Sequence, residues 1–134
     1  MAKGRTSSTT KSVYRVYLRK AEDFYRLVPM AIQANNINGA GLAAIHSVIS
    51  ACDALTVFHT GVRSRGESHL EVTELLRVLD LEGMRERVNQ IEGVLQLKNL
   101  VEYEDREISR TEALRLGTQA ERILSWVRKQ LPEV

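Results

Sequence analysis

Apolar residues recur at every third or fourth position in five segments of the chain, the spacing that places them on one face of a helix. None of the sequence shows the strict alternation of a confident β-strand. We therefore predict an all-α fold, a single up-and-down bundle of about five helices over residues 10–134. The predicted helices run from about Thr10 to Asn35, from about Gly41 to Thr60, from Ser68 to about Leu79, from near Met84 through Lys98–Glu107, and from Ser109 to Leu131.

Local signals predict where some of these helices begin or change direction. Ser68 and Ser109 are each followed three residues later by a glutamate, which is the spacing of a capping box. Asn38 is a candidate cap for the second helix. Pro29 is expected to bend or break the first helix, because proline lacks the backbone donor and clashes with the preceding turn.

The second predicted helix is apolar on most of its circumference, as expected for the central helix of a bundle. Its polar residues His46, Ser50 and Asp53 follow one another at i, i+4 and i+7, on a single narrow line. One interpretation is the one wet face of a central helix. The other is a polar binding pocket that faces another helix or another subunit, with Asp53 as its main member.

The fourth predicted helix changes character towards its end. Lys98 and Glu102 occupy the arc that apolar residues hold earlier in the helix, with Asn99 and Tyr103 on a line beside them. Charged groups on a core-facing arc are costly unless they pair or stay in contact with water. Two interpretations follow: the helix end lies in solvent, or these four residues line a cleft or a symmetric interface.

Composition limits the class of protein. The chain has 134 residues, 43% of them hydrophobic and 27% charged, which suits one globular domain. The net charge is +2, but residues 1–21 carry six basic groups and no acid, so we predict a flexible basic N-terminal tail over residues 1–9. A single cysteine, Cys52, fits a reducing cytoplasm. Apolar runs are too short to predict a membrane span, and no membrane partner is expected.

The order of motifs along the chain resembles that of HEPN (higher eukaryotes and prokaryotes nucleotide-binding) domain proteins. The resemblance covers about residues 17–127 and rests on three features. The sequence "KAE" lies near the start of the first helix, and Gly61, Ser68 and His69 form a "G…SH" connection to the third. A "KNxxxYED" segment then begins at Lys98, followed by "SxxEA…AE" from Ser109.

The resemblance implies a helical bundle that forms a homodimer. Many HEPN proteins are encoded beside a small nucleotidyltransferase, and others are metal-independent ribonuclease toxins with an arginine, a polar residue and a histidine within about six positions. Lys98, Asn99 and Tyr103 stand at those three places here. Lysine lacks the planar fork that grips two phosphate oxygens, and tyrosine is a poor base at neutral pH.

The function implied is therefore a HEPN-like module, non-catalytic or weakly active, in a toxin–antitoxin-like system. Such a module would bind a nucleotidyltransferase-type partner, a nucleotide or RNA in a site that includes Lys98, Asn99, Glu102 and Tyr103, with His46 and Asp53 as further candidates. The alternative function is a metal-independent endoribonuclease toxin.

Arg63 and His69 also have the ribonuclease spacing, but they lie in the loop before the third helix, where a first-turn structural histidine is the simpler interpretation. They are kept as alternative catalytic candidates. The histidines lack the pair spacing of zinc ligands, and the chain has no glycine-rich phosphate loop, so neither a metal site nor a cofactor is predicted.

Overall fold

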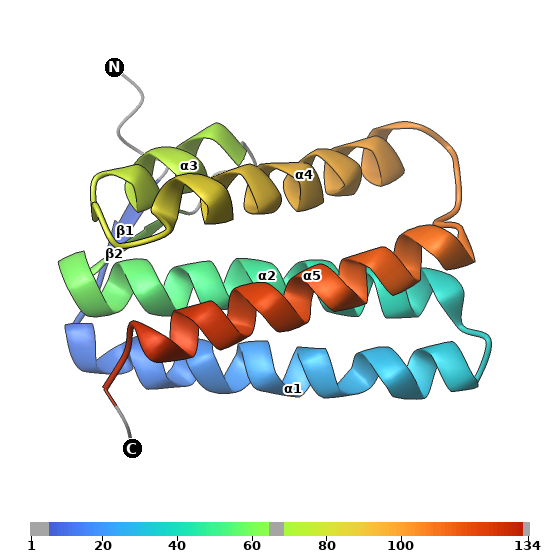
Figure 1. Ribbon diagram of the computed structural model, residues 1–134, viewed down its shortest axis with the longest axis horizontal. Coiled ribbons are helices and arrows are strands. Elements are labelled where there is room, and N and C mark those ends of the chain that lie inside the picture. Colours follow the sequence, from blue (N-terminus) through green and yellow to red (C-terminus); the bar gives the residue numbers. More distant parts are fainter. Residues whose placement is uncertain (1–5, 65–68, 133–134) are drawn as a thin grey trace.

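The computed structural model describes residues 6–64 and 69–132, and it confirms the predicted all-α helical bundle. The helices within these residues are α1 (Tyr14–Gln33), α2 (Ile37–Thr60), α3 (His69–Arg77), α4 (Met84–Tyr103) and α5 (Arg110–Lys129). Four long helices alternate in direction along the long axis of the molecule, and the short helix α3 packs beside α4 (Figure 1).

Helix α2 forms the centre of the bundle, packed against α1 on one side and α5 on another. Four of its small and branched residues, Ala44, Ile45, Val48 and Leu55, are at most 1% exposed. By length and composition α2 could also cross a membrane, which the sequence analysis did not anticipate. Because 72% of its most apolar window is buried within the bundle, packing against the other helices already accounts for its apolar character.

The start of α1 and its connection to α2 both differ from the prediction. A 3-10 turn, η2 (Lys11–Val13), precedes α1, and α1 continues without a break through Pro29 to Gln33. The cap of α2 is Asn36, whose Oδ1 accepts a hydrogen bond from the Gly39 amide at 3.1 Å, so the helix begins earlier than Gly41.

Asn38, the cap expected from sequence, instead connects the start of α2 to the loop between α4 and α5. Its side chain donates to Glu107 Oε1 at 3.2 Å and accepts from the Ile108 amide at 2.8 Å. The side chain of Ile108 is buried beside Ala40. This cross-link fixes the loop from which α5 starts.

Two short strands were not predicted. Strand β1 (Thr6–Ser8) pairs antiparallel with β2 (Val62–Ser64), in a register that sets Thr6 opposite Ser64. The Thr9 amide extends the pairing by donating to the Gly61 carbonyl at 2.8 Å. The first regular element therefore starts before residue 10, so Thr6–Ser8 do not belong to the flexible tail that was expected over residues 1–9.

The predicted capping box of α5 is present. Ser109 Oγ accepts from the Glu112 amide at 3.1 Å, and the Ser109 amide donates to Glu112 Oε1 at 3.0 Å. Arg106 adds two hydrogen bonds to the same carboxylate, at 3.0 and 2.9 Å. These hydrogen bonds lower the pKa of Glu112 to about 2, with the largest contribution from Arg106 and the next from Ser109. The corresponding cap predicted at Ser68 lies outside the described residues.

Candidate functional site

The charged pair on α4 explains how Lys98 and Glu102 share a core-facing arc. Lys98 Nζ lies 2.9 Å from Glu102 Oε1, one helical turn away. The lysine side chain is only 17% exposed and that of Glu102 is 45% exposed, so the pair sits at the edge of the bundle rather than inside it. The positive charge of Lys98 is therefore compensated within its own helix.

Asn99 and Tyr103 lie on the neighbouring line of α4, as predicted. Together with Gln96, Leu100 and Glu104 they border an open hollow of about 400 Å³. Tyr103 is 71% exposed and Leu100 is 42% exposed. This end of α4 thus presents a partly apolar surface with polar groups around it, a composition suited to contact with a partner.

Asp53 of α2 belongs to a second cluster, with neighbours from α1 and β2. It is 9% exposed, and its Oδ2 lies 3.7 Å from Arg63 Nη1 on β2. Burial raises the pKa of Asp53 to about 7, and the positive charges of Arg63 and Lys20 offset only part of that effect. A carboxyl held this way titrates near neutral pH.

An aromatic ring organises the same cluster. Arg63 and Lys20 both lie over Tyr17, with 5.3 and 5.6 Å from the cationic groups to the ring centroid. Tyr17 and Lys20 are separated by three positions on α1, so they share a face of that helix. Sequence reasoning missed both residues as site residues, because their spacing on α1 does not indicate that they lie near Asp53 of α2.

Of the two alternative catalytic candidates, only Arg63 has a described side chain. Its Nη1 lies 3.7 Å from Asp53 Oδ2, and its guanidinium lies over the ring of Tyr17. His69 begins α3, and its side chain lies outside the described part of the structure.

His46 is exposed and packs its ring beside Phe24 of α1, with 5.4 Å between ring centroids. It belongs to a line of four residues on α2, Leu42, His46, Ile49 and Asp53, which we call the α2 line. Between Ala40 and Val57 every residue of α2 is buried except Leu42, His46 and Ile49. Ser50, expected on the polar line, is buried at 8% exposure.

Comparison with protein-family models, with curated proteins and with solved structures finds no match for this chain. Within residues 6–64 and 69–132, no group of three or more His, Cys, Asp or Glu side chains could hold a metal ion.

Proposed function

We propose that this protein is a HEPN-like binding module that acts as a homodimer and has little or no catalytic activity of its own. The observation that carries the proposal is the α2 line. Between Ala40 and Val57, Leu42 is 40% exposed, His46 is exposed and Ile49 is half-buried, while the other residues of α2 are buried. A second copy packed against this line would bury both side chains, and the spacing of 4, 3 and 4 residues is that of a helix-packing seam.

The proposed ligand site is the end of α4. Lys98 is already paired with Glu102, and Asn99 and Tyr103 border an open hollow rather than an enclosed pocket. A phenol is a poor general base near neutral pH. A lysine that is already paired with a carboxylate gives little stabilisation to the transition state of phosphodiester cleavage. These features favour contact with a partner over cleavage of a bound strand. By resemblance, the partner is a small cytoplasmic nucleotidyltransferase, with a nucleotide or RNA as the other ligands to test.

The homodimer is tested by sedimentation velocity on the wild type and two matched variants. Leu42→Asp places a charge on the α2 line and is expected to give a monomer with unchanged helical circular dichroism. Leu114→Asp is the control, because Leu114 is similarly exposed (51%) but lies on α5. A wild-type monomer at micromolar concentration, or a dimer that survives Leu42→Asp, would reject this interface.

The weak or absent catalysis is tested by RNA cleavage on a gel with EDTA present. The wild type and Lys98→Ala are expected to show equally little cleavage. The double substitution Lys98→Arg with Tyr103→His should raise it by about a hundredfold, because it adds a bidentate phosphate clamp and a base that titrates near neutral pH. Strong wild-type cleavage that is lost in His69→Ala would instead identify a ribonuclease centred on the loop before α3.

A nucleotidyltransferase partner is tested by gene neighbourhood and by co-purification. A small nucleotidyltransferase encoded beside this chain, and retained by it on an affinity column, would support the pairing. Loss of that retention in Tyr103→Asp, with the dimer intact, would assign the contact to the end of α4. Equal retention by Tyr103→Asp would move the contact elsewhere on the surface.

A further inference from the structure

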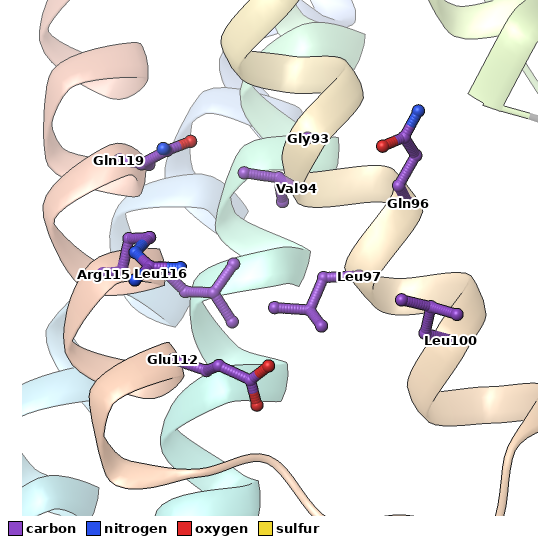
Figure 2. A pocket seen from close by; sticks show the side chains of 9 residues that line it. All are labelled: Gly93, Val94, Gln96, Leu97, Leu100, Glu112, Arg115, Leu116 and Gln119. Atoms are coloured by element: carbon purple, nitrogen blue, oxygen red, sulfur yellow. The ribbon is translucent and has the colours of Figure 1, made fainter.

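A cavity of about 290 Å³ lies between α4 and α5, apart from the α2 line and from the cluster around Asp53. Its walls are mainly apolar. Leu97 of α4 and Leu116 of α5 point toward one another across the gap, and Val94 lies three residues before Leu97 in α4 (Figure 2). Its volume is near the lower limit for sites that hold small ligands. We call it the α4–α5 cavity.

Gln119 gives this cavity a polar group that needs a partner. Its Oε1 is buried and accepts no hydrogen bond from the residues that the structure describes. The side chain extends from α5 towards Val94 of α4 (Figure 2). A buried amide oxygen without a donor destabilises the protein, so a ligand that supplies an N–H or O–H there gains more than it would in water.

Gly93 keeps one wall of the cavity bare. It lies in the middle of α4, where glycine is unfavourable compared with alanine. A Cβ built on Gly93 would meet no heavy atom within 4 Å, so contacts among the described residues do not require glycine here. The absence of a side chain at this place leaves room for an external group beside the helix backbone.

The charges at the rim indicate which kind of ligand fits. The carboxylate of Glu112 is occupied by Arg106 and by the amide of Ser109. Arg115, in contrast, is exposed and forms no ion pair or hydrogen bond with any residue in the described ranges. The rim therefore offers an unused positive charge and a negative charge that is already neutralised.

We propose that the α4–α5 cavity binds a small amphipathic carboxylate. Its apolar body lies between Leu97 and Leu116, an N–H or O–H donates to Gln119 Oε1, and its carboxylate meets Arg115. This site does not involve the α2 line, and of the residues around the hollow at the end of α4 it shares only Gln96 and Leu100.

The test uses N-acetyl-L-leucine, which carries an isobutyl group, an amide N–H and a carboxylate, on the ¹⁵N-labelled full chain. We expect saturable shifts of the Gly93 and Gln119 backbone amides, with a Kd on the order of 1 mM for so small a ligand. The uncharged N-acetyl-L-leucine amide should bind about threefold more weakly, the size expected of one exposed charge contact.

Three variants locate the site. Arg115→Gln should remove the preference for the carboxylate over the amide, whereas Arg122→Gln, an exposed arginine of α5 outside the cavity, should leave it unchanged. Gln119→Leu should weaken both probes by about tenfold, because it removes the acceptor. Should Gln119→Leu fail to fold, the exposed Arg115→Gln still decides the question.

Three results would overturn the proposal. One is the absence of saturable shifts at Gly93 and Gln119 for both probes. Another is a set of shifts at these amides that follows protein concentration without any probe, which would mean that a second copy of the chain fills the α4–α5 cavity. The third is binding that is indifferent to both Arg115→Gln and Gln119→Leu, which would exclude the assigned contacts.

Discussion

Replacing Asp53 by asparagine should stabilise this protein, although it breaks an ion pair. In the folded protein, burial raises the pKa of the Asp53 carboxyl from 3.8 to about 7, against the opposing charges of Arg63 and Lys20. The charged form is therefore the less favourable one in the fold. Asparagine keeps the size and hydrogen-bonding capacity of the side chain and removes the charge.

The magnitude follows from the linkage between protonation and folding. Because the folded pKa is raised, Asp53 costs nothing well below pH 3.8, where both states are protonated, and its cost grows as pH rises towards 7. At about 1.4 kcal/mol per pKa unit, the full cost above pH 7 is about 4 kcal/mol. Arg63 is 32% exposed and can be hydrated when its partner is neutral. Losing the ion pair therefore offsets only a little of the stability that Asp53→Asn gains.

The assay is urea unfolding of wild type and Asp53→Asn, followed by circular dichroism between pH 5 and pH 8. The advantage of Asp53→Asn should grow by about 2–3 kcal/mol over that range. Asp105→Asn, at an exposed carboxyl, is the control and should show no such growth. A destabilised Asp53→Asn at pH 8, or an advantage that does not change with pH, would mean that Arg63 and Lys20 outweigh burial.

Three smaller predictions test the helices themselves. Ser109→Ala should lower the free energy of unfolding by about 1 kcal/mol, because it removes one half of the capping box, and a thermal melt with unchanged stability would contradict this. A double-mutant cycle with Lys98→Met and Glu102→Leu should give a coupling of about 0.5 kcal/mol, as expected for a partly exposed pair, and strict additivity would mean that both side chains act independently. Gly93→Ala should raise the free energy of unfolding by about 0.5–1 kcal/mol, because its Cβ meets open space, and a destabilised variant would reveal a close contact at that position.

The helices could be predicted because each one repeats a local signal. The apolar residues of α5 recur every three or four positions, and Ser109 and Glu112 lie three residues apart, so both periodicity and cap are readable in a short window. The pairing of Thr6 with Ser64 has no such signal. It depends on where η2 and α1 bring the chain, and three residues per strand are too few to show alternation.

The candidate sites were only partly readable for the same reason. The pair Lys98–Glu102 lies within one helix, so its spacing alone indicated that the two side chains could meet. The residues around Asp53 come from two other elements, α1 and β2. Nothing in the local sequence indicates that Tyr17 and Lys20 of α1 lie near Asp53 and Arg63. The predicted polar line on α2 includes Ser50, which is buried, whereas the side chains left uncovered between Ala40 and Val57 are those of Leu42, His46 and Ile49.

The charges at these sites bear on which partner fits best. Lys98 is paired with Glu102, Arg63 with Asp53, and Arg106 with Glu112, so each of these basic groups has a carboxylate within 4 Å. Opening an exposed pair such as Lys98–Glu102 costs less than about 1 kcal/mol, so a phosphate could still displace the glutamate. The displaced carboxylate would then repel the same phosphate. A surface whose positive charges are balanced by carboxylates also gains little from counterion release. A protein partner, which can meet both charges and cover Leu100 and Tyr103, fits the end of α4 better than a nucleic-acid strand.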